Sequence, residues 1–165
     1  MLHNDKTNVK AMSILCLDPG TKTGWCIYDD GKIKSGVIDL KPNRHQGGGM
    51  RYLKLHNFMK ECCKHHDLME VYFEEVHAHK GTYAAQIYGG LSATIMKFCE
   101  KREIPYRGIR VADIKRAVTG RGNATKDCVI KAVKKLGHNP ADDNEADAIA
   151  LLYAIQSQDS LDDIF

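Results

Sequence analysis

The first apolar run of the chain is Met12-Ser-Ile-Leu-Cys-Leu17, and Asp18-Pro19-Gly20 follows it directly. A short run of this composition predicts a buried β-strand, and the Pro-Gly pair ends it because proline has no N–H for the ladder. Asp18 is therefore the last residue of a buried strand. A carboxylate in that place is either a turn residue or a functional group held rigidly by the strand.

The residues on either side extend this strand into an α/β pattern. Segments 23–29 and 32–39 read as two more strands, and Asp29-Asp30-Gly31 between them predicts a hairpin turn. Pro42 and Gly47–Gly49 mark a flexible connection. Alternating elements follow, with helices predicted at 50–65, 83–102, 111–118, 125–136 and 143–155 and strands at 71–73 and 104–109. The expected fold is a five-stranded mixed sheet that begins with an antiparallel meander and carries helices on both faces.

The composition indicates a folded globular protein but does not identify its binding partner. The chain has 165 residues, enough for one domain, and 43% of them are hydrophobic. The net charge of +3 is too small to argue for nucleic acid. Segment 97–136, however, is dense in Lys and Arg and is where we expect a phosphate-contacting face. Six cysteines, no signal peptide and no membrane-length apolar run favour a reduced cytoplasmic protein with no membrane partner.

Four carboxylates stand where burial would hold them rigid. Asp18 and Glu74 each end an apolar strand, and Asp147 lies within an otherwise apolar helix. Asp143 precedes Asp147 by four residues, which places both on one helical face. Phosphodiester cleavage by two divalent ions needs such carboxylates at one point, because hard cations prefer oxygen ligands. Each acid taken alone could also have an ordinary structural role. The prediction of a metal site therefore rests on the placement of all four together.

Neighbouring acids are assigned to structure. Asp142 fits the N-cap of the last helix, and Glu145 three residues later completes a capping box. Glu74 and Glu75 alternate in direction along their strand, so only one of them faces the site. Asp143 also fits a first-turn acid that complements the helix dipole.

At this point the sequence resembles the RuvC-like Holliday junction resolvases over residues 12–157. Four stretches in the family's order carry the resemblance, and they are Ile14–Gly24 with its Asp-Pro-Gly and Thr-Gly, Phe73-Glu74-Glu75-Val76, the basic Lys115–Lys126, and Asp143-Asn-Glu-Ala-Asp147-Ala. The second match selects Glu74 over Glu75. The order of elements likewise resembles the ribonuclease H-like fold, which the family has.

The resemblance implies a crossover junction endodeoxyribonuclease. It would cut Holliday junctions and other branched DNA as a homodimer, in recombination and repair or in phage DNA processing. Two Mg²⁺ ions, replaceable by Mn²⁺, would be held by Asp18, Glu74, Asp143 and Asp147. Lys126 would offset charge developing on the phosphate. The residues expected to contact DNA are Lys115, Arg121, His77, Lys80 and Tyr83. The helix at 83–102, with Gly89-Gly90, is a candidate dimer interface.

Three departures qualify this resemblance. In many bacterial members the last two metal ligands are three residues apart, but the residue three before Asp147 in this chain is Asn144. The acid Asp143 lies four residues before Asp147, a spacing that resembles the mitochondrial members. His77 occupies the position at which bacterial members carry a Phe that stacks at the junction centre. We therefore expect His77 or Tyr83 to stack there. The compact Asp142–Asp147 motif resembles the bacteriophage-type branch, whose members act on several branched DNAs.

Other readings remain open. Leu17–Gly24 also resembles the phosphate loop of actin-like ATPases and sugar kinases, but those need a second related domain. A catalytically inactive junction-binding protein would be expected to lose an acid. Cys62 and His66 have the i, i+4 spacing of a zinc pair. Yet Cys62, Cys63, His65 and His66 cannot all converge from one helix, and basic residues at a helix end are ordinary.

The two ends of the chain lie outside the resemblance. Residues 1–11 are polar and patternless and are expected to form a flexible arm. Residues 158–165 are expected to form an acidic tail after a helix ending near Ser157. Gln158, Leu161, Ile164 and Phe165 in this tail resemble a sliding-clamp-binding peptide. The alternative is that these apolar side chains fold back on the protein's own surface.

Overall fold

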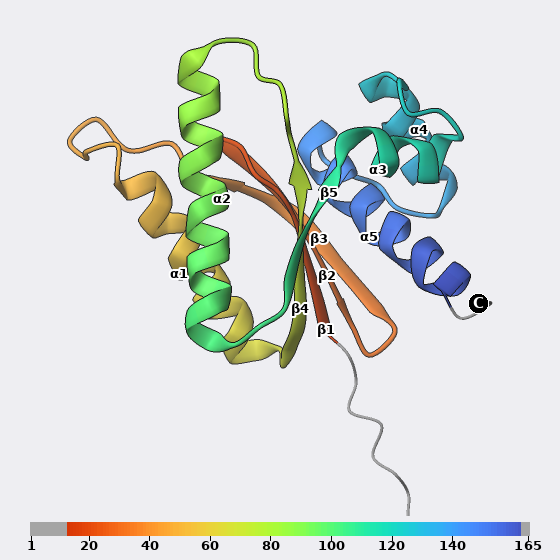
Figure 1. Cartoon of the computed structure of the whole chain (residues 1–165), viewed down its shortest axis with the longest axis horizontal. Coiled ribbons are helices and arrows are strands. Elements are labelled where there is room, and N and C mark those ends of the chain that lie inside the picture. The colour runs from red at the N-terminus through yellow and green to blue at the C-terminus, as the bar shows by residue number, and fades with distance from the viewer. Residues whose placement is uncertain (1–12, 163–165) are drawn as a thin grey trace, which may run out of the picture.

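A five-stranded sheet forms the centre of the computed structural model, which describes residues 13–162 (Figure 1). The strand order is β3-β2-β1-β4-β5. The bounds are Ser13–Asp18 for β1, Lys22–Asp29 for β2, Lys32–Asp39 for β3, Leu68–Glu75 for β4 and Tyr106–Arg110 for β5. β1 is therefore the central strand, and the expected five-stranded sheet is confirmed.

The sheet is mixed, as expected. β1 and β3 pair antiparallel with β2, whereas β4 is parallel to both β1 and β5. Asp30 and Gly31 join β2 to β3 with φ of 47° and 76°. Two consecutive residues with positive φ are what a tight two-residue hairpin requires, which explains the Asp-Gly pair.

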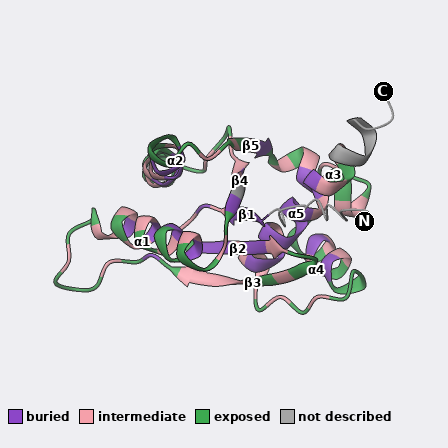
Figure 2. Cartoon of the chain, turned by 90° about the horizontal axis from the view of Figure 1, so that it is seen from below, coloured by how far each residue is buried: buried purple, intermediate pink, exposed green. Residues whose placement is uncertain are grey.

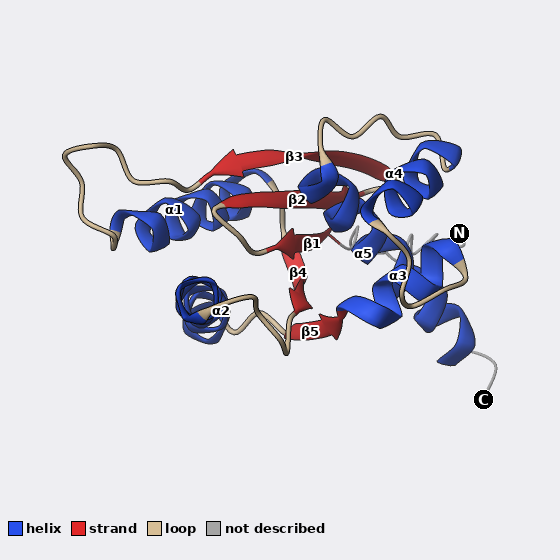
Figure 3. Cartoon of the chain, turned by 90° about the horizontal axis from the view of Figure 1, so that it is seen from above, coloured by secondary structure: helices blue, strands red, loops and turns tan. Residues whose placement is uncertain are grey.

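Helices cover both faces of the sheet (Figure 3). Helices α1 (Met50–His65) and α2 (Thr82–Arg102) lie on one face. On the other face lies α5 (Asp143–Asp162), with α3 (Val111–Thr119) and α4 (Lys126–Lys135) packed against it. Each interface buries its own apolar core, seen as buried residues on both sides of the sheet in Figure 2. Because strand side chains alternate, Leu15 and Leu17 enter the α1–α2 core and Cys16 enters the α5 core.

Several expected boundaries are wrong. The strand expected at 71–73 extends from Leu68 to Glu75, and the last helix continues to Asp162 instead of ending near Ser157. The first part of the expected tail is thus helical. Residues 1–12, which include the expected arm, and residues 163–165, which include Ile164 and Phe165, lie outside the described residues. The sliding-clamp interpretation stays a prediction.

Two other features acquire a structural explanation. A Cβ on Gly90 would lie 2.4 Å from the Tyr52 ring, so this glycine lets α2 pack closely on α1, whereas Gly89 faces open space. The Cys62 thiol is buried, which raises its pKa to about 12, and His66 Nδ1 contacts Asp29 Oδ2 at 2.6 Å. His66 is therefore engaged by Asp29, whereas Cys62 lies in the apolar core. No helix within residues 13–162 is long and apolar enough to cross a membrane.

Candidate active site

Asp18 and Glu74 meet at the carboxyl ends of two neighbouring parallel strands. Leu17 pairs with Phe73 in the β1–β4 register, so the next residues, Asp18 and Glu74, lie side by side. Leu17 and Phe73 both point into the α1–α2 core. Because side chains alternate along a strand, Asp18 and Glu74 point to the opposite face, toward α5. The same alternation turns Glu75 away from α5.

Helix α5 brings the remaining two acids to this point. Asp18 pairs with Gly24 of β2, and a Cβ on Gly24 would lie 1.8 Å from the backbone oxygen of Asn144. The first turn of α5 therefore rests directly on the β2 backbone, which only a glycine allows. Asp143 and Asp147 flank this contact on the helix. The close approach brings both carboxylates beside Asp18.

A polar network fixes the start of α5. The Glu145 N–H donates to Asp142 Oδ1 at 3.0 Å, which confirms Asp142 as the N-cap. The Glu145 carboxylate accepts from Ser35 Oγ at 2.6 Å and from the Ala141 N–H at 2.7 Å. In an ordinary capping box that second bond comes from the N-cap residue itself. Here it falls one residue earlier, and Ser35 ties the helix to β3.

The electrostatics of the acids reflect their closeness. Burial, followed by the negative charges of Glu74, Asp147 and Asp143, raises the pKa of Asp18 well above its ordinary range. Burial and Asp147 raise the pKa of Glu74 to about 7. Burial and Asp143 raise the pKa of Asp147 to about 6. Buried negative charge from three segments of the chain thus gathers around Asp18.

Two lysines lie at the edge of this cluster. Lys126 Nζ donates to Asp143 Oδ2, and this contact lowers the pKa of Asp143 and raises that of Lys126. Lys115 lies close enough to lower the pKa values of Glu74 and Asp147. Lys126 is mostly exposed, with 72% of its side chain accessible. Lys126 therefore lies between Asp143 and solvent.

The acids fit a divalent metal by their chemistry. Carboxylate oxygens are the ligands that Mg²⁺ prefers, and the raised pKa values of Glu74 and Asp147 show that a cation here would relieve repulsion between buried charges. The oxygen atoms of the four carboxylates do not converge on a single metal position. Within residues 13–162, no three His, Cys, Asp or Glu side chains are grouped closely enough to hold an ion. The Lys126 ammonium already engages Asp143.

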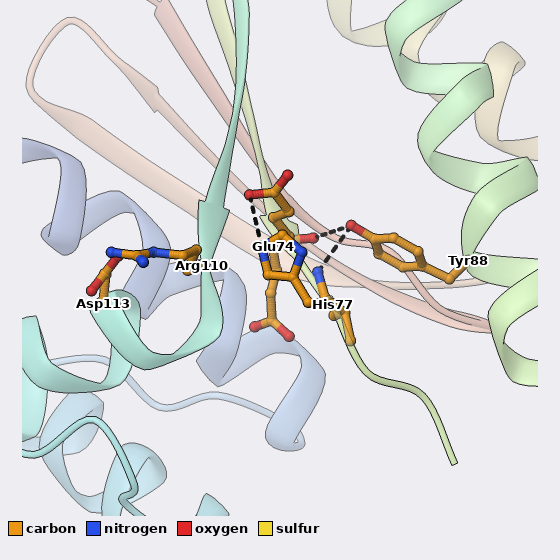
Figure 4. A network of polar contacts seen from close by, with 7 residues as sticks. Glu74, His77, Tyr88, Arg110 and Asp113 are labelled. Atoms are coloured by element: carbon orange, nitrogen blue, oxygen red, sulfur yellow. Dashed lines mark hydrogen bonds and ion pairs between the residues drawn. The ribbon is translucent and has the colours of Figure 1, made fainter. Parts of the chain in front are cut away.

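Sequence reasoning missed Tyr88, which holds the end of β4. Its hydroxyl donates to the Glu74 carbonyl oxygen at 2.9 Å and accepts from the Val76 N–H at 3.1 Å (Figure 4). Tyr88 belongs to α2, so these bonds tie the backbone beside a catalytic candidate to the helix on the other face of the sheet. A tyrosine in a helix carries no local signal for such a contact.

The residues expected to contact DNA occupy two places. His77 and Lys80 are exposed in the β4–α2 connection, and Tyr83 in the first turn of α2 is 69% exposed. His77 Nε2 lies 3.5 Å from Glu75 Oε2. Arg121 lies apart from them in the α3–α4 connection. The Gly120 and Arg121 N–H groups bond to the Arg116 carbonyl and to Thr119 Oγ1, and the Arg121 contact with DNA stays a prediction.

The profile of the family "Crossover junction endodeoxyribonuclease RuvC" matches residues 14–155, a span that contains all four acids and both lysines. The chain belongs to the RuvC family. RuvC from Halorhodospira halophila is 32% identical over 143 residues, covering 83% of this chain and 85% of that protein. RuvC from Campylobacter concisus is 33% identical over 162 residues, covering 87% of this chain and 96% of that protein.

Solved RuvC structures share the fold of this family member. Thermus thermophilus RuvC in complex with a Holliday junction substrate superposes with a TM-score of 0.75 at 20% identity, covering 91% of this chain and 96% of that one. The yeast mitochondrial Holliday junction resolvase superposes with a TM-score of 0.59 at 11% identity, covering 87% and 78%. The ribonuclease H-like expectation is thereby confirmed.

Proposed function

We propose that this RuvC-family enzyme resolves four-way DNA junctions by metal-dependent hydrolysis of phosphodiesters. One observation carries the proposal: three carboxylates from β4 and α5 lie near enough to raise the pKa of Asp18 at the end of β1, with Lys126 and Lys115 at the edge. A binding protein without chemistry has no use for buried acids that repel one another. Such a cluster is stabilising only when a cation joins it.

Each side chain has a part to play in this reaction. Asp18, Glu74, Asp143 and Asp147 would hold two Mg²⁺ ions, which supply Lewis-acid activation of a water nucleophile and of the phosphate, and Mn²⁺ would substitute. Lys126, already bonded to one acid, offsets negative charge that grows on the scissile phosphate. Lys115 faces the same phosphate from α3. Tyr88 keeps the Glu74 backbone in place.

The substrate is branched DNA, and the enzyme works as a homodimer in the cytoplasm. Two symmetric nicks require two active sites related by a two-fold axis. His77, Lys80 and Tyr83 line the connection that leaves β4 directly after Glu74, which suits contacts at the branch point. The Asp142–Asp147 motif supports placement in the bacteriophage-type branch, so we expect cutting of three-way and flap DNA beside four-way junctions.

The test compares isosteric variants of the acids on one labelled junction with Mg²⁺. Asp18→Asn, Glu74→Gln and Asp147→Asn are expected to lose cutting by at least 1,000-fold, an order of magnitude typical for a lost catalytic group, while junction binding persists. Glu75→Gln is the matched control, because it lies on the same strand but points away from α5. Full activity in all three variants would refute the site.

The spacing of the last two acids is tested separately. Asp143→Asn is expected to be nearly inactive and Asn144→Ala active, because the Asp143 carboxylate lies in the charge cluster. The reverse result would assign the ligand to Asn144. A wild-type enzyme that binds junctions but cuts none with Mg²⁺ or Mn²⁺ would instead be a junction-binding protein.

A further inference from the structure

We infer that Lys126 occupies the place of a metal ion in the metal-free enzyme, and that it passes from Asp143 to the scissile phosphate when an ion binds. Its ammonium donates a hydrogen bond to Asp143 Oδ2. Asp143 is one of the four acids that we propose to hold Mg²⁺, so this bond ties a metal-binding candidate to a cation of the protein itself. The inference rests on the proposed function, because it assumes that the acids bind metal.

The charge of Lys126 acts on the whole acid cluster. Burial raises the pKa of three of the acids, and the Lys126 ammonium opposes that rise at each of them; these acids are Asp18, Glu74 and Asp147. The hydrogen bond from Lys126 is the first cause of the lowered pKa of Asp143. One ammonium therefore supplies part of the positive charge that all four carboxylates need when no ion is bound.

The same bond explains why the four carboxylates do not converge. Lys126 begins α4, which packs beside α5 on one face of the sheet (Figure 3). Its side chain is 72% exposed, whereas that of Asp143 is 30% exposed, so the ammonium holds the Asp143 carboxylate on the solvent side of the cluster. While this bond lasts, Asp143 cannot turn fully toward Asp18. An ion that takes Asp143 must therefore displace the lysine.

The lysine, and not the acid, is the partner that is free to move. The first turn of α5, which carries Asp143, rests on the backbone of Gly24 and is tied to β3 by Ser35. Lys126 has a long, flexible and exposed side chain, and only its backbone is fixed, because Thr125 caps the start of α4. Breaking the bond thus releases the ammonium and leaves the carboxylate beside the other acids.

Charge determines the direction of the exchange. A divalent ion carries a larger charge than an ammonium, and the two cations would repel each other on one carboxylate. Lys126 therefore leaves Asp143 when an ion takes it. The released ammonium then lies beside metal ions and needs an anion, and the scissile phosphate is the anion that the substrate brings there. The lysine thus reaches the phosphate only after the metal position is filled.

The first experiment counts Mn²⁺ bound to the protein without DNA, from the electron paramagnetic resonance signal of the free ion. Lys126→Gln is expected to tighten the weaker-bound Mn²⁺ by about tenfold, the size of one hydrogen bond between charged groups. Lys115→Gln is the matched control. The Lys115 charge also acts on Glu74 and Asp147, but Lys115 forms no ion pair with any acid of residues 13–162, so its smaller gain measures the effect of charge alone.

Removal of the contested carboxylate provides the second comparison. In an Asp143→Asn background, Lys126→Gln should leave the Mn²⁺ affinity unchanged, because the acid for which the ion and the lysine compete is gone. Equal gains for Lys126→Gln and Lys115→Gln, or a gain that persists with Asp143→Asn, would overturn the exchange. Matching melting temperatures by circular dichroism establish that all variants are folded.

The second experiment follows the lysine itself. Acetylation of Lys126 by N-hydroxysuccinimide acetate, measured by mass spectrometry, should be several-fold faster with Mg²⁺ than with EDTA, because the released amine has lost its acidic partner. Lys134, exposed on the same helix, is the internal reference. In Asp143→Asn the Lys126 rate should be high under both conditions. A Lys126 rate that does not respond to Mg²⁺ would show that the bond survives metal binding and would overturn the inference.

Neither measurement requires DNA cutting, so the two proposals can fail separately. A wild-type enzyme that cuts junctions, with no gain in Mn²⁺ affinity for Lys126→Gln, would overturn the exchange and leave the nuclease intact. The expected gain in a protein that cuts nothing would support the exchange and refute the nuclease.

Discussion

The Glu74 carboxylate shows how a single residue trades stability for function. Burial and its acidic neighbour raise its pKa from 4.5 to about 7. Its folded-state pKa is therefore above its unfolded value, and the folded protein binds more protons between those two values. Stability must then fall as the pH rises through this window, since the folded state has to give up a proton that the unfolded state has already lost.

Glu74→Gln is expected to stabilise the metal-free protein at pH 8. A neutral amide of the same shape removes the buried charge, and the shift sets an upper bound on the order of 3 kcal/mol. The gain should shrink toward pH 4.5, where Glu74 is protonated in the folded state and already half protonated in the unfolded state. Melting temperatures in EDTA from pH 4.5 to 8 test this, with Glu75→Gln as control. A Glu74→Gln variant that melts below wild type at pH 8 would contradict it.

Tyr88 acts on chemistry through position alone. Tyr88→Phe removes the hydroxyl that bonds to the Glu74 carbonyl and the Val76 N–H, and each bond contributes about 1 kcal/mol. We expect kcat to fall about tenfold with KM nearly unchanged. Tyr106→Phe is the control, because it removes a similar hydroxyl bond, to Glu100 Oε1, away from the site. Equal kcat values for the two variants would leave Tyr88 a purely structural residue.

At the scale of elements, the site depends on how closely α5 approaches the sheet. Gly24 permits the contact with Asn144, and Glu145 ties the same helix turn to Ser35 of β3. Neither contact involves a metal-binding candidate. Both decide whether Asp143 and Asp147 reach Asp18.

Gly24→Ala is expected to displace the start of α5. The added methyl group would overlap the Asn144 carbonyl, and overpacking of this kind costs about 1–3 kcal/mol. The rise in melting temperature caused by Mg²⁺ should shrink as well, because two of the four acids move. Gly47→Ala, where a Cβ meets open space, serves as the control. An unchanged response to Mg²⁺ would show that α5 tolerates the shift.

Local patterns predicted the elements better than the contacts between them. The alternation in β1 and the Asp30-Gly31 turn are properties of a few adjacent residues, so the meander was predictable. The predicted strand at 71–73 was too short because the charged Glu70 separates Leu68 from the apolar run Val71-Tyr72-Phe73. Tyr88 and Gly24 act on partners 14 and 120 residues away, respectively, and no periodicity reports such a contact. Asp18, Glu74 and Asp147 stood out because each ends or interrupts an apolar run, and Asp143 stood out by its four-residue spacing to Asp147.

At the scale of the whole molecule, α2 leaves one face free for a partner. Leu91, Ile95 and Phe98 turn into the core, whereas Gly89 and Ala93 are exposed one helical turn apart. The absence of side-chain bulk lets another backbone approach closely. This is the face on which we expect the homodimer to form.

A bulky charge on that face should therefore separate the subunits. Gly89→Arg combined with Ala93→Arg is expected to convert a dimer to a monomer in sedimentation velocity, and paired nicking of one junction should become single nicking. Gly48→Arg, in the open connection before α1, is the control. A dimer that survives the double substitution would place the interface elsewhere.

The separation of the two apolar cores has a consequence for how such proteins diverge. Leu15 and Leu17 meet the α1–α2 layer on the face opposite the acids, so inherited changes in that layer reach the chemistry through Tyr88 and not through the acids themselves. Lineages can therefore exchange the α1–α2 layer while keeping one ancestral site. A graft of both helices from a distant relative should preserve the acids, provided that the donor supplies a hydroxyl where Tyr88 stands.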